Sequence, residues 1–436
     1  MSDAATTEAR PPAGALGSNY AKLWTASAIS NLGDGIDGAA LPLLAAYLTR
    51  DPLLFAGVAV AGRLPWLLFS LQAGAIADRV DRKRLMATVN VIRFGLMGAL
   101  GLAVLGDWAT IWLLYLVAFG LGVAETLFDN AAQALMPALV RKAQLERANG
   151  RLYGAEIVTN QFAGPPLGGL LFAVAMSLPI LLDAGTFLVS GLLIFAISGS
   201  YVARGATAPG ATAPGPRRRM RQEIGEGLRW LWNHRVLRAL ALMLGLANMM
   251  GMVVFSVFAL FALDVVGVSE VGFGLLLTAT AVGSFASSLV AGRVADRIGR
   301  GPALMWSVVG FSLPMIVQGA FPNVVVVAAM GVVFGFFVVL WNIITVSLRQ
   351  SIIPDELLGR VNSVYRFFGW GSIPIGGLLG GLLAQAFGLR APFFVAGAVT
   401  LLALVVFLPV VNTRTIEEAR AAAAADEGTT GTDGEH

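Results

Sequence analysis

A ten-residue segment occurs twice in this chain and divides it into two halves. GAIADRVDRK at residues 74–83 returns as GRVADRIGRG at residues 292–301, 218 residues later in a chain of 436. Self-similarity of this kind indicates a duplicated structural unit. Each copy ends an apolar stretch and begins a charged turn, as a short loop between two membrane helices does. The repeat therefore predicts two halves built on one plan, an arrangement typical of transporters.

The apolar character of the chain exceeds what a soluble core can bury. Hydrophobic residues make up 57% of the sequence and charged residues only 13%. A membrane helix needs about 20 apolar residues, and twelve such stretches occur, six in each half. The predicted fold is therefore an all-α integral membrane protein, with twelve transmembrane helices in two pseudo-symmetric six-helix halves.

The basic residues are distributed unevenly over the predicted loops. Of the 30 Lys and Arg residues, only Arg50 and Arg390 fall in loops on one side, while Arg63 and Arg93 fall inside spans. The others lie at the termini or in the opposite loops. Because Lys and Arg are enriched in cytoplasmic loops, both termini are predicted to be cytoplasmic, in a multi-pass protein of a bacterial cell membrane. The basic run RRRMR at 217–221 is then explained by the cytoplasmic location of the linker. No nucleic-acid partner is predicted.

The predicted layout has five segments, of which the middle one is a linker containing GATAP twice in succession. In order, they are a cytoplasmic N-terminal tail (1–22), an N-terminal six-helix bundle (23–199), a cytoplasmic linker (200–236), a C-terminal six-helix bundle (237–412) and a cytoplasmic C-terminal tail (413–436).

The residues present exclude several sources of energy and chemistry. A phosphate-binding loop of Walker type needs a glycine before its lysine, but the three lysines follow Ala21, Arg82 and Arg141. His234 and His436 are the two histidines of the sequence, too few for a histidine metal centre and badly placed for a Ser-His-Asp hydrolase. The chain is therefore predicted not to be an enzyme, to need no metal or organic cofactor, and to use a proton gradient or run downhill.

Charged side chains inside membrane helices are costly and usually functional, and here they are concentrated in the first half. At about 1.5 Å of rise per residue, Asp37 and Arg63 lie at similar depth and are predicted to form a structural ion pair. Asp34, about one helical turn from Asp37, is the first candidate for binding the coupling proton, and Glu125 and Glu156 are the others. The alternative roles are helix packing, capping and a buried polar network. The charged residues considered in these helices are Asp34, Asp37, Arg63, Arg93, Glu125, Asp129 and Glu156.

Five motifs carry a resemblance to a known family. They are NLGDGIDGAALPLL (31–44), GAIADRVDRKRLM (74–86), LERANGRLYGAE (145–156), GPPLGG (164–169) and EGLRWLWNH (226–234). Over residues 20–412 the chain resembles transporters of the major facilitator superfamily, and within it the branch of bacterial macrolide-efflux proteins and enterobactin exporters. The first loop departs from the family pattern in having Asp81 where glycine is usual, whereas the second copy keeps Gly299.

The resemblance implies that the repeated loop motif controls a gate. An arginine of this motif often pairs with an acid near the inner end of span four in the family, so Arg82 and Asp129 are expected to form a latch. Asn342 stands opposite Arg300 in the second half, which predicts asymmetric gating. We further expect Asp78 and Asp296 to face the N-terminal ends of spans eleven and five across the seam between the halves. The full set of expected gating residues is Gly74, Asp78, Arg79, Arg82, Asp129, Asp296, Arg297 and Arg300.

GPPLGG is similar to the core of a span-five motif associated with proton-driven drug antiporters. The matching residues are Gly164, Pro165, Gly168 and Gly169, while Asn160 stands where the family has glycine. Prolines remove backbone donors and kink a helix, and glycines allow helices to approach closely. The motif predicts either a tight seam between the halves or a kink with no role in the direction of transport.

A flexible apolar wall would suit varied apolar ligands, and the second half offers residues for one. The alternative for these side chains is packing in the core or against lipid. The candidate cavity residues are Asn160, Asn248, Met249, Met252, Trp341 and Trp370.

The residues and the resemblance together predict a secondary active transporter. It would export an amphipathic small molecule, such as a drug, an antibiotic or a siderophore, by proton antiport through alternating access. Its predicted partners are the lipid bilayer and this substrate, and it is predicted to be a monomer. The alternatives are an uptake or facilitative permease of the same fold and a lysophospholipid transporter.

Overall fold

The computed structural model describes residues 16–77, 79–199, 201, 220–410, 412–419 and 421. Regular secondary structure in this part of the chain is entirely helical. Asp78, most of the predicted linker, the first 15 residues and most of the predicted C-terminal tail lie outside the described residues.

The helices follow each other in two series separated by the linker. The first series is α1 (Ser18–Leu48), α2 (Pro52–Ala77), α3 (Arg82–Leu105), α4 (Ile111–Leu139), η1 (Lys142–Gln144), α5 (Leu145–Glu156), the π-helix η2 (Ile157–Ala163), α6 (Gly164–Val174) and α7 (Ser177–Phe195). The second is α8 (Met220–Asn233), α9 (Arg235–Phe255), α10 (Phe258–Leu260), the π-helix η3 (Phe261–Val266), α11 (Glu270–Ile298), α12 (Arg300–Ala320), α13 (Val324–Ile352), α14 (Asp355–Gly371), α15 (Ile373–Phe387) and α16 (Ala391–Phe407).

The helical lengths suit a membrane. By length and composition, nine helices within the described ranges could cross one. The long helix α1, the continuous run α5–η2–α6 and the shorter apolar helix α16 occupy the other three predicted spans. Large apolar side chains such as Leu102, Leu116 and Phe195 are exposed, which lipid tolerates and water does not. The all-helical membrane fold is confirmed, and the twelve predicted spans fit it.

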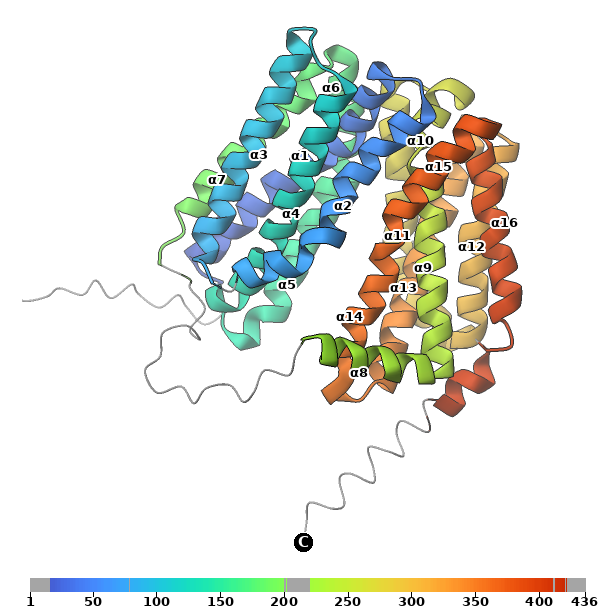
Figure 1. Cartoon of the computed structure of the whole chain (residues 1–436). Helices are drawn as coiled ribbons and strands as arrows, with labels where there is room; N and C mark the ends of the chain where they lie inside the picture. The colour runs from blue at the N-terminus through green and yellow to red at the C-terminus, as the bar shows by residue number, and fades with distance from the viewer. Residues whose placement is uncertain are drawn as a thin grey trace, which may run out of the picture.

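Both described ends of the chain lie at the same end of the bundle (Figure 1). At the start of α1, Asn19 Nδ2 donates to the carbonyl of Ser198 (3.1 Å), and Lys22 Nζ donates to the carbonyl of Ala196 (2.6 Å). Thr413 lies against Gly301 at the start of α12. We call this end of the bundle the terminal end and the opposite end the far end.

The two halves meet along a seam in which α2 packs on α15 and α6 packs on α11. Across the seam at the far end, Arg50 Nη1 forms a salt bridge with Asp264 Oδ1 (2.8 Å), and Gln385 Nε2 donates to Asp51 Oδ2 (3.2 Å). Figure 1 shows the ribbons of the two halves close together near α10 and diverging toward α5 and α8. The halves are therefore joined at the far end.

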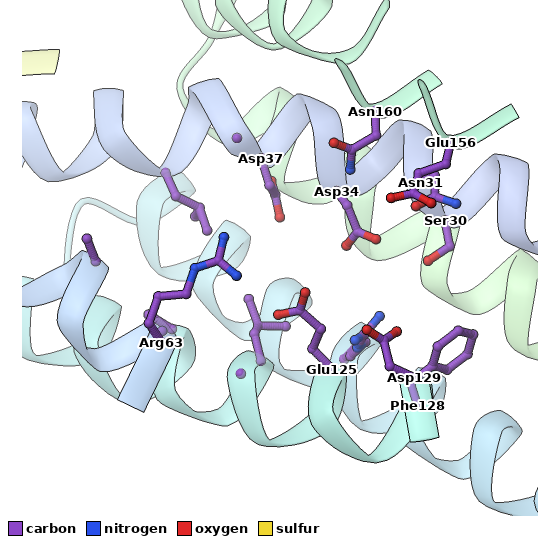
Figure 2. Close-up of a pocket in the computed structure, with 18 of the residues that line it drawn as sticks. Ser30, Asn31, Asp34, Asp37, Arg63, Glu125, Phe128, Asp129, Glu156 and Asn160 are labelled. Atoms are coloured by element: carbon purple, nitrogen blue, oxygen red, sulfur yellow. The ribbon is translucent and has the colours of Figure 1, made fainter. Parts of the chain in front are cut away.

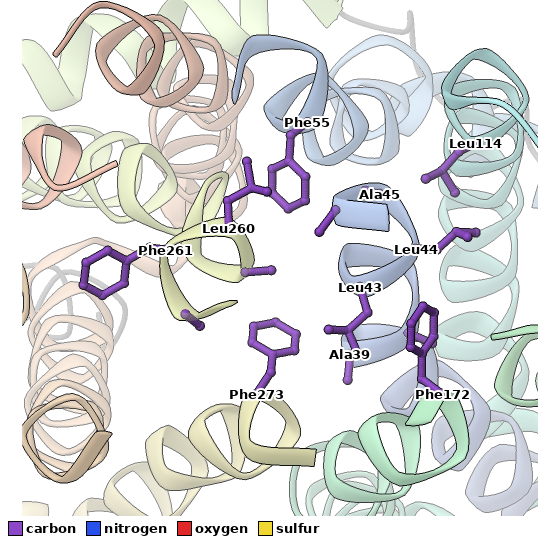
Figure 3. Close-up of a cluster of buried hydrophobic side chains, with 14 of the residues drawn as sticks. Ala39, Leu43, Leu44, Ala45, Phe55, Leu114, Phe172, Leu260, Phe261 and Phe273 are labelled. Carbon is purple, nitrogen blue, oxygen red and sulfur yellow. The ribbon is translucent and has the colours of Figure 1, made fainter. Parts of the chain in front are cut away.

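A buried apolar cluster reinforces this junction. Figure 3 shows Phe55 and Leu43 of the first half facing Leu260 and Phe273 of the second. All four side chains are buried and belong to one cluster. Apolar packing of this density resists separation of its two sides, because each side chain loses many contacts when a gap opens. The cluster forms a plug between the halves at the far end.

Glycines place α1 in backbone contact with span five. A β-carbon on Gly35 would lie 2.4 Å from the carbonyl oxygen of Asn160, and one on Gly168 would lie 2.2 Å from that of Ile36. Backbone atoms cannot move aside as the end of a side chain can. Glycine is therefore required at both positions for this separation of α1 and α6.

The two copies of the repeated loop turn in different ways. Gly299 precedes α12 with φ of 84°, a conformation that L side chains rarely adopt. Asp81 precedes α3 with φ of −64°, and its side chain accepts from the backbone N–H of Arg84 (3.0 Å). An N-cap carboxylate of this kind replaces the left-handed turn. The departure of the first loop from the family pattern at Asp81 thus has a local physical reason.

Helix α8 packs beside α14 at the terminal end, where Arg360 Nη1 and Glu226 Oε2 form a salt bridge of 2.7 Å. His234, the residue after α8, caps α9. Its Nδ1 accepts a hydrogen bond from the backbone N–H of Leu237 (3.2 Å). Burial lowers the pKa of His234. The neutral ring that the cap requires is therefore favoured.

Candidate functional site

A cavity of about 930 Å³ lies between the helices. Most of its lining comes from the first half, from α1, α2, α3, α4, α7 and the span formed by α5 and η2. The lining includes Pro137 and Leu145 near the terminal end, and Phe55 and Phe273 of the buried cluster near the far end. The cavity thus extends from the terminal end to the plug.

The two walls of the cavity differ in chemistry. The wall from the first half carries the ionisable side chains, several of which point into a common space in Figure 2. The second half contributes an apolar wall with one hydroxyl. Its members are Met252, Phe255, Ser256, Phe258, Ala259 and Phe273.

Arg93 on α3 is the buried cation of this site, with 4% of its surface exposed. Its guanidinium lies between the rings of Phe128 and Phe187, 5.2 Å from each centroid. Cation–π contacts of this kind compensate part of the lost hydration. The charge of Arg93 acts on Asp34, Asp129 and Asp183. Arg93 therefore supplies a positive charge near acids from three different helices.

The predicted ion pair of Asp37 with Arg63 is wrong. Arg63 is exposed and lines the cavity, and Figure 2 shows its side chain reaching in from α2. Asp37 is 7% exposed, and its carboxyl group lies against that of Asp183 on α7. Equal depth along two helices does not decide which faces meet, and the carboxyl-bearing face of α1 turns toward α7.

The three candidates for proton coupling, Asp34, Glu125 and Glu156, all line the cavity. Glu125 Oε2 accepts from Trp66 Nε1 on α2 (3.4 Å). Asp34 has the charge of Arg93 nearby. Glu156 ends α5, directly before the π-helix that contains Asn160. π-Helical segments are rare and frequent at functional sites.

The expected latch between Arg82 and Asp129 is not formed among the described contacts. Arg82 Nη1 instead donates to the carbonyl of Ala134 (2.8 Å), and Asp129 faces the cavity and the charge of Arg93. Asp129 sits more than one helical turn before Ala134 on α4, and this offset separates the two groups.

The other expected gating residues that the structure describes lie at the two copies of the repeated loop. Gly74 is half-buried on α2, with Asn130 of α4 as its neighbour. Arg79, Asp296 and Arg297 are exposed at the terminal end, where the halves diverge. Nη1 of Arg300 is buried without a hydrogen-bond partner among the described residues. A joint gating role for these groups stays a prediction.

The antiporter-type motif lies at a three-way contact. Gly164, Pro165, Gly168 and Gly169 are all buried. Gly164 and Gly168 face α1, while a β-carbon on Gly169 would lie 2.3 Å from the carbonyl oxygen of Glu270 on α11. Pro165 and Pro166 have no N–H to donate, and the π-helix η2 ends directly before them. The motif therefore packs α6 against both α1 and the second half.

The predicted cavity wall is only partly right. Asn160 and Met252 line the cavity. Asn248 Nδ2 donates to the carbonyl of Gly369 (2.8 Å), and Met249 has its backbone against Gly376.

The two tryptophans predicted for this wall lie elsewhere. Trp341 is buried in a separate apolar core beside Phe311. Trp370 stacks on Trp66 across the seam, with ring centroids 5.7 Å apart. These tryptophans were expected at the cavity from composition alone, which cannot assign a helix face.

Asp183, which lies behind the cavity wall beside Asp37, is an ionisable residue that the sequence analysis missed. It is fully buried in α7, and Thr186 Oγ1 donates to its Oδ1 (2.8 Å). The available signal was an acid alone in the apolar stretch LPILLDAGTFLV. An ionisable residue in such a segment is a functional candidate by default.

Two helical bundles around a cavity with buried charges define a membrane transporter of the major facilitator class. The sequence profile of the family described as transmembrane secretion effectors matches residues 15–428, and the chain belongs to this family. The resemblance to the major facilitator superfamily is confirmed, and the protein is a multi-pass membrane transporter and not an enzyme.

Named relatives cover nearly the whole chain. It is 29% identical to the multidrug efflux pump Tap of Mycolicibacterium fortuitum, over 88% of this chain and 94% of Tap. It is 23% identical to macrolide efflux protein A of Streptococcus pyogenes, over 89% and 95% of the two chains. The fold is shared with a bacterial homologue of the iron transporter ferroportin in an inward-facing state, with a TM-score of 0.72 at 18% identity over 90% and 98% of the chains.

Proposed function

We propose that this protein exports an amphipathic small molecule across the bacterial cytoplasmic membrane by proton antiport. The observation that carries the proposal is the unequal lining of the cavity, charged on the first-half wall and apolar on the second. An amphipathic molecule presents one surface to each wall. The volume of about 930 Å³ is within the range of pockets for drug-sized ligands.

The names of the relatives support export, and the arrangement of the halves indicates where a substrate can enter. The relatives named above carry the names of a multidrug efflux pump and a macrolide efflux protein. The halves are joined at the far end and diverge at the terminal end. If the terminal end is cytoplasmic, a substrate enters the cavity from the cytoplasm or the inner leaflet, and alternating access carries it outward. The transporter needs no cofactor beyond the proton gradient and works as a monomer.

Inside-out vesicles with an acidified lumen test this proposal. We expect them to accumulate at least one of a panel of dyes, macrolides and siderophores, and to lose it when the pH gradient is collapsed. Phe255→Ala removes an exposed ring of the apolar wall and should raise KM for that compound. Phe387→Ala removes an exposed ring away from the lining and should not. Accumulation only in right-side-out vesicles would show an uptake permease, and movement of lysophospholipid alone would show a lipid transporter.

The orientation is a separate expectation, based on the uneven distribution of Lys and Arg. We expect both termini and the 200–236 linker to be cytoplasmic. A reporter fused after Gly210 should be active only when it is of a kind that works in the cytoplasm, such as a fluorescent protein. Activity of alkaline phosphatase at the same fusion point would contradict the orientation.

A further inference from the structure

We propose that the side chains of Asp37 and Asp183 form a carboxyl pair that binds and releases the coupling proton. The inference rests on the proposed function, because it names the group through which proton antiport would operate. The pair lies between α1 and α7, at the wall of the cavity.

The contact between these two side chains requires a proton. Asp37 and Asp183 are 7% and 0% exposed, and their carboxyl groups lie against each other at hydrogen-bonding range. An ionised carboxylate only accepts hydrogen bonds, so two of them cannot form one. Oδ1 of Asp37 and Oδ2 of Asp183 are also buried without a donor from any group in the described part of the chain. One shared proton satisfies both oxygens.

The surrounding residues are shaped for this pair. A β-carbon on Gly33 would lie 1.8 Å from Oδ1 of Asp183 and 2.2 Å from Oγ1 of Thr186. Any other residue at position 33 would push Asp183 away from α1. Thr186 Oγ1 occupies Oδ1 of Asp183 at 2.8 Å, which leaves Oδ2 for Asp37. The hydroxyl donor and the absent side chain together fix the orientation of Asp183.

Other charged groups face the pair from the neighbouring helices, and they distinguish it from Asp34. Arg93 from α3 acts on Asp183 and on Asp34. Asp34 from α1 faces the pair, and Glu125 and Asp129 from α4 act on Asp34. The Asp37 carboxyl is affected by its own burial and by the neighbouring carboxyl groups of Asp183 and Asp34. No cation is among the groups that act on it. The Asp37 end of this acidic pair therefore has no cation among the groups that act on it. The shared proton supplies the positive charge there. Arg63 of α2 lines the same cavity and acts on Asp129.

Loss of the shared proton would act on the seam between the halves. Asp37 reaches the cavity lining, so the proton leaves through its carboxyl to the cavity and two negative charges remain between α1 and α7. Like charges at this distance repel. α1 is in backbone contact with α6 through Gly35 and Gly168, and α6 contacts α11 through Gly169. A shift of α1 away from α7 therefore reaches the second half through contacts that have no side chains to absorb it.

Infrared spectroscopy of the purified protein tests the pair without any transport substrate. We expect the pair to contribute a carboxylic-acid C=O band that disappears as the pH is raised. Asp37→Asn and Asp183→Asn should each remove this band, because an amide donates to the remaining carboxylate and replaces the proton. Asp34→Asn is the matched control, since it makes the same change on the same helix and cavity wall, and it should leave the band in place.

Proton release on ligand binding tests the coupling role. In weakly buffered detergent solution, ethidium should release protons from the wild-type protein and from Asp107→Asn, which makes the same change in the exposed turn after α3, but not from either pair variant. If Asp183→Asn does not accumulate in the membrane, Asp37→Asn at the cavity edge still decides the result. A band that persists in the pair variants, or that only Asp34→Asn removes, overturns the proposal. If the band behaves as expected but vesicles show no proton-driven transport, the carboxyl pair stands and proton antiport fails.

Discussion

Arg93→Gln is expected to destabilise the protein strongly. The change removes the cation shared by Asp34, Asp129 and Asp183, and it leaves the rings of Phe128 and Phe187 without their charged partner. Removing one partner from a buried charge network costs about 3–5 kcal/mol. The measurement is the midpoint of thermal aggregation of the purified protein in detergent. The loss should shrink as the pH falls, because protonated carboxyl groups no longer need a cation.

Arg63→Gln is the matched control for this effect. Arg63 lines the same cavity and carries the same charge, but it is exposed. Exposed ion pairs contribute about 0–1 kcal/mol, so the thermal midpoint should stay close to that of the wild type. If both variants lowered the thermal midpoint equally, the burial of Arg93 would add nothing to its contribution to stability.

Gly274→Val is expected to open the far end. Gly274 on α11 faces span five so closely that a β-carbon would lie 2.3 Å from the carbonyl oxygen of Pro165. Overpacking of this kind costs about 1–3 kcal/mol. Since the contact exists only while the halves are joined at the far end, this cost falls on that arrangement. The equilibrium between the two arrangements should shift about 5- to 150-fold.

Labelling of a single cysteine measures the shift, because the natural sequence contains none. Ala259 is buried in the plug and lines the cavity, so Ala259→Cys should react slowly with an impermeant thiol reagent added at the far side. Adding Gly274→Val should raise the labelling rate about 5- to 150-fold. Gly292→Val makes the same change on the same helix, where nothing lies within 4 Å of the added β-carbon, and should not alter it. Equal rates in all three proteins would contradict a closed far end.

The repeat and the apolar stretches were sufficient to predict the architecture. Spacing along a helix axis is fixed at about 1.5 Å per residue, so depth in the membrane can be read from sequence position. Asp34, Glu125 and Glu156 were chosen as candidates because charges inside membrane helices are usually functional, and the structure brings all three to one cavity. The direction in which each side chain points depends on how the helices are rotated against each other. Depth contains no information about that rotation.

The errors at the site follow from this missing rotation. Asp37 and Arg63 share a depth, but Asp37 points to α7 and Arg63 into the open cavity. Trp341 and Trp370 sit in the right half yet outside the cavity lining, one in a core and one in the seam. The turn at Asp81 could not be derived either, because glycine at Gly299 and a capping aspartate are two local solutions to one bend. Pairings across helices require the packed structure.

The chemical difference between the two cavity walls has an evolutionary consequence. Phe255, Phe258 and Phe273 belong to the half that carries none of the buried acids described above. Selection by a new toxic compound can therefore reshape the apolar wall while the charged wall keeps its sequence. Gene duplication supplied two copies of one bundle, and only one of them had to retain the ionisable residues. Resistance to unfamiliar compounds should accordingly arise by substitutions in the second half, with the dependence on pH unchanged.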